Sequence, residues 1–240
     1  RVPSLLRNIM EPLVMKFPLG GSIMPLRKAQ SYLQQARVPL PDRMETYNFL
    51  HRSPLLEIFE PEFLQAVDTE RPLELAREAY FRCGSSEMIE RMMHLDHKTT
   101  LADNDLRKVT RMCEAAGVEV RFPFLDDDLI AFSGQLKPEH KVHKGRLRVL
   151  FKDALRGFLP DETITKSQHG FGLPFGIWLN EHGALKQLAE DALISLGKRG
   201  IVRPGYLDYL RREHASGHAS YYGVMIWVLV ELELWLQANA

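Results

Sequence analysis

Asp105, Lys108 and Arg111 follow one another at intervals of three residues within the segment 101–112. If this segment is helical, the spacing places the three side chains on one face. A carboxylate and two cations on such a face could bind an anionic ligand. The alternative is an exposed face with ion pairs inside the helix. From spacing alone we favour this alternative, because such charge patterns are common in helices.

Glu119 and Arg121 alternate with bulky apolar residues just before Pro123. The alternation suggests a buried or half-buried ion pair, which a protein tolerates only when the charges are matched and hydrogen-bonded. We expect this pair to brace a turn rather than to carry chemistry. Asp126 is well placed to cap a helix that begins near Asp127, because an Asp side chain accepts hydrogen bonds from free backbone N–H groups at a helix start.

Residues 137–156 contain seven basic and two acidic side chains, which gives a local excess of five positive charges. The basic residues are Lys137, Lys141, Lys144, Arg146, Arg148, Lys152 and Arg156. In a chain without net charge, such a bias could bind phosphates. A solvated face of an amphipathic helix would explain the charges equally well, so both interpretations stay open.

Residues 166–178 contain three glycines, aromatic side chains and a proline, which is typical of an ordered loop with a constrained backbone. The polar opening of this loop, residues 166–170, is a suitable place for ligand contacts, since binding residues concentrate on loops. The Gly-x-Gly pattern is weak by itself, and without a preceding strand it is no dinucleotide fingerprint. His169 could be a binding group, although a surface or packing histidine is more common.

Most of the segments that must position these residues show an apolar repeat of helical period. Apolar side chains recur at helical spacing between Leu147 and Phe158. Further helices are expected at 25–36, 42–51, 60–67, 70–82, 98–116, 181–196 and 219–238. The only strand signal, at 118–122, is short and weak. We therefore expect an all-α, mainly helical chain with at most two short strands, and a single domain over residues 1–240.

Composition excludes several classes of protein. Lys plus Arg and Asp plus Glu both number 31, so a nucleic-acid partner is not expected. Cys83 and Cys113 fit no metal or redox spacing, which favours a reducing cytoplasm and predicts no metal site. The apolar stretch 221–236 contains Glu231 and Glu233, so it is expected to be a core helix rather than a membrane span. No signal peptide is evident at the start. The chain begins with Arg1 rather than with an initiator Met, which suggests a fragment of a longer protein.

The four segments together resemble the glutamine-hydrolysing asparagine synthetase family. Its synthetase domain has a stretch similar to Leu-Ala-Asp-Asp-Leu-Leu-x-Lys-x-Asp-Arg-Met, followed by Leu-Glu-x-Arg-x-Pro-Phe-Leu-Asp. Residues 101–112 and 118–126 match these stretches at the same spacing. A basic helix as in 144–155, a Gly-Phe-Gly-x-Pro loop with a Trp as in 168–178, and Leu-Glu-Leu-Trp at 232–235 follow. The resemblance is strong over 95–179 and at the C-terminus, and diffuse before Glu70.

This resemblance implies the helical C-terminal part of an adenine-nucleotide α-hydrolase-like synthetase domain, whose parallel sheet lies upstream. In this family ATP activates a carboxylate, usually that of aspartate, as an acyl-adenylate, and ammonia from glutamine then forms the amide. Asp105 and Lys108 align with the catalytic Asp and its basic partner. The nucleotide-binding loop corresponds to Lys166, Gln168, His169 and Gly170.

The same resemblance implies the partners of the chain. The parent protein would use ATP and Mg²⁺ and would carry nucleotide-binding and glutaminase domains upstream, and a homodimer is left open. The family's Ser-Gly-Gly-x-Asp-Ser loop and its Gly-Glu-Gly-x-Asp-Glu segment are absent from this sequence. Without that loop no nest of backbone N–H groups holds the phosphates. We therefore expect this chain alone to bind no cofactor tightly and to form no amide.

Gln168 stands where the family usually has a Lys before Gly-Phe. A neutral amide cannot replace the point charge of an ammonium on a phosphate, although the long side chain of Lys166 could compensate. An alternative is therefore a non-catalytic anion- or partner-binding module derived from the family. A polyanion-binding domain built on residues 137–156 is a third hypothesis, which zero net charge disfavours.

In the full-length parent we expect Gln168→Lys to raise the rate of adenylate formation, because an ammonium stabilises the departing pyrophosphate better than an amide does. A well-placed donor of this kind is worth about 3 kcal/mol, on the order of a hundredfold in rate. If Lys166 already reaches the phosphates, Lys166→Ala is the damaging change and Gln168→Lys is nearly silent. Pyrophosphate release by both variants and the parent measures this, and equal rates for all three would contradict a phosphate contact of this loop.

Overall fold

The computed structural model describes residues 24–46, 48, 50, 53–167, 172–216 and 219–239. Contacts within the chain define two units, one formed by residues 1–73 with 172–240 and the other by residues 74–171. The expectation of a single domain over residues 1–240 stays a prediction. Of the loop expected to bind the nucleotide, Lys166 is described, whereas Gln168, His169 and Gly170 lie outside the described residues.

The chain is mainly helical, as the apolar periodicity predicts. In the first unit the helices are α2 (Met24–Arg37), α3 (Asp42–Glu45), α4 (Leu55–Ile58), α5 (Pro61–Ala66), α13 (Phe175–Glu181), α14 (Gly183–Leu196), α15 (Pro204–Ala215) and α16 (Ala219–Asn239). Helix α6 (Arg71–Arg82) begins at the end of this unit's first segment and runs into the second unit.

The second unit continues with α7 (Met88–Asp96), the π-helix η2 (His97–Leu106), α8 (Arg107–Ala115), the 3₁₀ turn η3 (Pro123–Leu125), α9 (Asp127–Gln135), α10 (Pro138–Lys141), α11 (Val149–Ala154) and α12 (Asp161–Thr165). Its two strands, β1 (Val142–His143) and β2 (Arg146–Leu147), pair antiparallel. No other sheet occurs in the described part of the chain, which confirms the expectation of at most two short strands.

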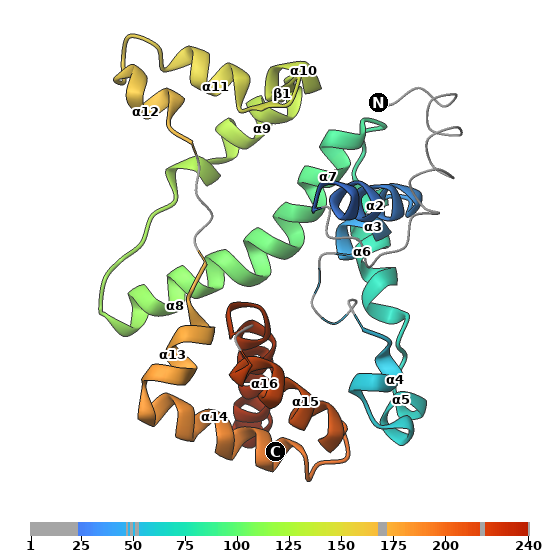
Figure 1. Ribbon diagram of the computed structural model, residues 1–240. Helices are drawn as coiled ribbons and strands as arrows, with labels where there is room; N and C mark the ends of the chain where they lie inside the picture. Colours follow the sequence, from blue (N-terminus) through green and yellow to red (C-terminus); the bar gives the residue numbers. More distant parts are fainter. Residues whose placement is uncertain are drawn as a thin grey trace. The chain divides into compact units, whose positions relative to one another are not determined.

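Helices α13, α14 and α15 all pack against α16, and Figure 1 shows them gathered around it. The expected core helix over the apolar stretch 221–236 is confirmed, because Met225, Ile226, Leu229 and Val230 are all buried in α16. Burial of one such side chain contributes about 1.5–3 kcal/mol. The four helices therefore share one continuous hydrophobic core.

Two glycines bring α13 and α16 into close contact. A Cβ added to Gly223 would lie 2.4 Å from the Cα of Gly176, so neither helix could approach this closely with a side chain at that point. Beside the crossing, the rings of Phe175 and Trp227 stack with centroids 4.8 Å apart. The buried His214 of α15 places Nε2 3.0 Å from the carbonyl oxygen of Gly176. Since a carbonyl only accepts, Nε2 carries the hydrogen in this contact.

Glu233 of α16 is fully buried and is the acceptor of a hydrogen-bond cluster. Ser195 donates from Oγ at 2.6 Å, Arg199 from Nε at 2.6 Å and Nη2 at 3.0 Å, and Gln237 from Nε2 at 2.9 Å. Burial alone raises the pKa of Glu233, but the hydrogen bonds from Arg199, Ser195 and Gln237 outweigh burial and hold the pKa below its ordinary value of 4.5. This cluster fastens the end of α14 to α16.

The segment around α4 is attached to the connection between α14 and α15. Backbone hydrogen bonds of 2.9 Å join Glu60 N–H to the Ile201 carbonyl and Arg203 N–H to the Ile58 carbonyl. Ile58 and Val202 are both completely buried at this junction. Residues far apart in the sequence are thereby fixed side by side within the first unit.

In the second unit, α7, η2 and α8 follow one another without a break from residue 88 to residue 115. The helix expected over 98–116 is therefore present and ends within one residue of the expected position, but the helical run begins at residue 88 rather than at residue 98. The Lys141 ammonium lies 2.7 Å from a carboxylate oxygen of Glu90, and both side chains are largely buried. This ion pair joins α7 to α10. Asp126 caps α9 as expected, accepting from the backbone N–H groups of Asp128 and Leu129 at 3.1 and 3.3 Å.

The expected helix between Leu147 and Phe158 is too long, because α11 occupies only Val149–Ala154. Lys144 and Gly145 both have positive φ, 48° and 79°, which is the backbone of a two-residue hairpin turn, so β1 and β2 form where a helix start was expected. The basic segment 137–156 is therefore not one amphipathic helix. It consists of α10, the hairpin and α11.

Glu119 and Arg121 form an ion pair, but their side chains are 75% and 82% exposed. The expectation of a buried or half-buried pair is therefore wrong. Residues 118–122 form no strand, and without a neighbouring strand their alternating pattern has no sheet to face. Water solvates both charges, so the pair contributes little to stability.

We expect Glu233→Gln to lower the free energy of unfolding by about 2–3 kcal/mol at pH 7, because it removes the charge that Arg199 pairs with and disrupts a buried acceptor. The depressed folded-state pKa means that the carboxylate adds stability above pH 4.5, and that this contribution is lost as pH falls through the lower folded-state value. The difference between parent and variant should therefore shrink in acid. Urea unfolding across the pH range measures it, with the exposed Glu231→Gln on the same helix as the control. A pH-independent difference would contradict the ionised state.

We expect Gly223→Ala to destabilise the first unit by about 2–3 kcal/mol, because the new methyl group overlaps the backbone at Gly176. Gly205→Ala in α15 is the matched control, since nothing lies within 4 Å of its added Cβ. That change should alter stability by less than about 1 kcal/mol. Thermal unfolding followed by circular dichroism compares the two, and equal effects would contradict the close helix contact.

Candidate functional site

Asp105 and Lys108 lie across the junction between η2 and α8. The Lys108 Nζ is 3.0 Å from Asp105 Oδ1, and the two side chains are 61% and 50% exposed, in that order. The structure thus brings these two predicted site residues together. Because an exposed pair of this kind is worth only about 0.2–1 kcal/mol, either group can exchange its partner for a ligand at little cost.

Arg111, the third member of the expected charged face, has a different partner. Its Nη1 donates to Glu114 Oε2 at 2.9 Å, one turn further along α8. Arg107 similarly lies 3.8 Å from Asp103. The helix therefore presents a row of exposed intrahelical ion pairs rather than one carboxylate shared by two cations.

The π-helical geometry of η2 is a feature that the sequence analysis did not predict. In a π-helix the backbone N–H bonds to the carbonyl five residues earlier, so each turn is wider than an α-helical turn. Residues 101–106, which include Asp105, lie in this widened stretch. Such segments are frequent at functional sites, but no residue pattern in a single sequence signals one reliably. The Thr99 hydroxyl, which donates to the Leu95 carbonyl at 2.9 Å, adds a bond near its start.

Lys166 follows α12 directly, and its side chain is exposed. Within the described part of the chain this side chain makes no hydrogen bond or ion pair, and none joins it to Asp105 or Lys108. Its ammonium is therefore solvated. The other three residues expected to bind the nucleotide, Gln168, His169 and Gly170, stay predictions because they lie outside the described residues.

The basic segment 137–156 offers fewer unpaired cations than its composition indicates. Lys141 is held by Glu90. Arg156 lies between Asp153, at 3.3 Å, and Asp161, at 3.9 Å. These carboxylates offset part of the positive charge that could otherwise attract phosphates.

Among the residues that the structure describes, no three His, Cys, Asp or Glu side chains converge on a point where they could hold a metal ion. No helix in the described part of the chain has the length and apolar character needed to span a bilayer.

Comparison with known proteins gives a consistent family. Residues 19–237 match the family described as asparagine synthase. The chain is 22% identical over 241 residues to a protein of Bacillus subtilis (strain 168) named asparagine synthetase [glutamine-hydrolyzing] 1. It is 23% identical over 239 residues to a putative asparagine synthetase [glutamine-hydrolyzing] of Mycobacterium tuberculosis (strain ATCC 25618 / H37Rv).

Each match covers nearly all of this chain but only a part of the relative. They include 100% and 94% of this chain, but only 36% of each relative, so the chain spans about a third of the length of these relatives. A second Bacillus subtilis protein, asparagine synthetase [glutamine-hydrolyzing] 3, is 34% identical over 65 residues, which is 27% of this chain. No solved structure matches the chain.

Proposed function

Because this chain belongs to the asparagine synthase family, we propose that it is the C-terminal part of an ATP-dependent, glutamine-hydrolysing ligase. The reaction activates a carboxylate, which we take to be that of aspartate, as an acyl-adenylate. Pyrophosphate leaves in this step. Ammonia derived from glutamine then attacks the acyl carbon, and the amide forms as the acyl–phosphate bond breaks and AMP leaves. The observation that carries the proposal is the family match over residues 19–237, nearly the whole chain.

In this proposal Lys108 stabilises negative charge on the phosphates, and Asp105 holds the ammonium in position. The distance of 3.0 Å between them supports these roles because the carboxylate orients the ammonium, and the exposure of the ammonium leaves it open to a polyanion. Charge on the departing pyrophosphate is where a fixed cation accelerates such a reaction most. The solvated Lys166 and the neighbouring Gln168, His169 and Gly170 would add contacts to the phosphates.

The proposal requires partners that this chain does not contain. The nucleotide-binding sheet and the glutaminase domain would belong to the remaining part of the parent protein, which we place in the cytoplasm. A bound Mg²⁺ would neutralise charge between phosphate oxygens. The described residues hold no cluster that fits it, so we assign it no ligand and no step here. We further propose that residues 1–240 act as one domain of the parent.

Gln168 favours a second function. If the neutral side chain at this position marks a lost phosphate contact, the chain is a non-catalytic module that binds an anion or a partner. The two functions differ in one measurable step. Only the ligase releases pyrophosphate when it is given both ATP and a carboxylate.

We expect Lys108→Ala in the full-length parent to lower the rate of pyrophosphate release with ATP and aspartate by about a hundredfold, because the charge that meets the phosphates is lost. Lys108→Arg keeps the charge and should retain much more of the rate. Lys98→Ala is the matched control, since Lys98 is an exposed cation on the same run of helix. The 240-residue chain alone should release no pyrophosphate.

Two outcomes would refute parts of this proposal. A parent protein that releases no pyrophosphate with any carboxylate is not a ligase, and the binding function then replaces it. A parent that is active but indifferent to Lys108→Ala is a ligase whose phosphate contacts lie elsewhere.

A further inference from the structure

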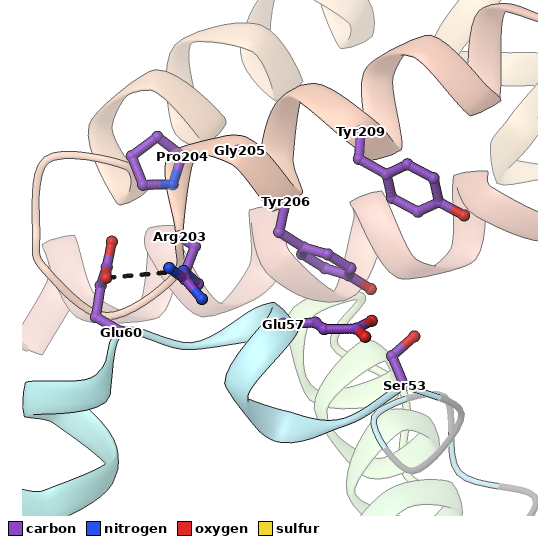
Figure 2. A pocket seen from close by; sticks show the side chains of 8 residues that line it. All are labelled: Ser53, Glu57, Glu60, Arg203, Pro204, Gly205, Tyr206 and Tyr209. Carbon is purple, nitrogen blue, oxygen red and sulfur yellow. Dashed lines mark ion pairs between the residues drawn. The ribbon is translucent and has the colours of Figure 1, made fainter.

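A cavity of about 600 Å³ lies in the first unit, between the segment that contains α4 and the start of α15. Figure 2 shows its lining, in which Ser53, Glu57 and Glu60 come from one side, and Arg203, Tyr206 and Tyr209 from the other. None of these is a residue proposed to act in amide formation. The volume is within the range of small-molecule sites.

The lining has one carboxylate in excess. The Arg203 guanidinium already interacts with two acceptors. Its Nε lies 4.0 Å from a carboxylate oxygen of Glu60, and its Nη1 donates to the Leu56 carbonyl at 2.7 Å. Glu57, by contrast, has no cation paired with it among the described residues. Among the described lining residues there are two carboxylates and one guanidinium, and Glu57 is the carboxylate without a paired cation.

Two aromatic rings face the same space as this carboxylate. The ring centroids of Tyr206 and Tyr209 are 6.1 Å apart, and Figure 2 shows the hydroxyl end of Tyr206 directed toward Glu57. Burial, together with the nearby Tyr209, Tyr221 and Glu57, raises the pKa of Tyr206, so its phenol stays neutral. A neutral phenol ring presents a negative π-face, which attracts cations.

Tyr209 is held in place from behind. Its hydroxyl lies 2.9 Å from that of Tyr222, and the two rings meet edge to face. The hydrogen bond to Tyr209, with burial, raises the pKa of Tyr222 to about 12, so this contact persists over the whole physiological pH range.

The two sides of the cavity are also fixed to each other. Backbone hydrogen bonds between Glu60 and Ile201 and between Arg203 and Ile58 join the two chain segments that line it. A site whose walls are already in position loses little entropy when a ligand binds.

We propose that this cavity binds a small organic cation with a planar guanidinium head, which pairs with Glu57 and stacks on the tyrosine rings. A guanidinium presents N–H donors as a fork that matches a carboxylate and a flat face that matches an aromatic ring. The serine and tyrosine hydroxyl oxygens accept its remaining hydrogens. An anion is disfavoured, because Arg203, the cation among the described lining residues, already has two acceptors.

The test compares two probes of the same shape, n-butylguanidinium and the uncharged n-butylurea, titrated into the purified protein and followed by NMR. We expect the cation to bind at least about tenfold more tightly than the urea. Glu57→Gln should remove this preference, whereas Glu62→Gln, an exposed carboxylate on α5 outside the cavity, should leave it unchanged. Tyr209→Phe should keep the preference and Tyr209→Leu should reduce it.

Equal binding of the two probes, or binding of neither, would overturn the proposal. A preference for the cation that persists in Glu57→Gln would also overturn the proposal, because a group other than Glu57 would then recognise the positive charge of the ligand. Glu57 is exposed, and circular dichroism melting curves of each variant establish that the fold is intact. Pyrophosphate release by the parent protein is independent of all these outcomes.

Discussion

The buried carboxylate of Glu233 is the constraint on which the C-terminal bundle depends. A charge without water around it is tolerated only when donors surround it, and here three side chains supply four hydrogen bonds. Two of those side chains, Ser195 and Arg199, come from the end of α14 and the turn that follows it. Their positions are therefore set by Glu233. That same turn leads into the antiparallel bridge between Val202 and Phe59, whose neighbours Arg203 and Glu60 line the cavity.

The two units differ in how they are stabilised. The first has a continuous apolar core, whereas among the described residues of the second unit, 74–167, the buried apolar side chains are Ala76, Tyr80, Leu95 and Ile164. Many large apolar side chains of the second unit stay at its surface, among them Met112, Phe124, Phe132, Phe151 and Phe158. The buried pair of Glu90 and Lys141 joins two of its helices, but such a pair adds little net stability because both charges lose their water. The residues proposed to act on the nucleotide thus lie on the less densely packed unit.

Long apolar repeats predicted the fold well. The stretch 221–236 and the segment 98–116 are helices because their periodic side chains match a helical period over several turns. The hairpin at 142–147 escaped prediction, since Lys-Gly with two positive φ angles is a turn that helix propensity does not exclude. The burial of charged side chains was the feature that the sequence predicted least well. Glu119 and Arg121 are exposed, while Glu233 is buried and Glu90 is largely buried, because burial depends on contacts with residues about 35 to 50 positions away. The spacing of Asp105 and Lys108 did predict their contact, since both lie on one turn.

The contact between Gly176 and Gly223 has a mechanical consequence. Helix α13 is the first helix after the loop that begins at Lys166, and its first turn is clamped by this contact and by the stacked rings of Phe175 and Trp227. The C-terminal end of the loop is therefore attached to a rigid support. Since α16 is the longest helix of this bundle, the first turn of α13 cannot shift without displacing α16 as well.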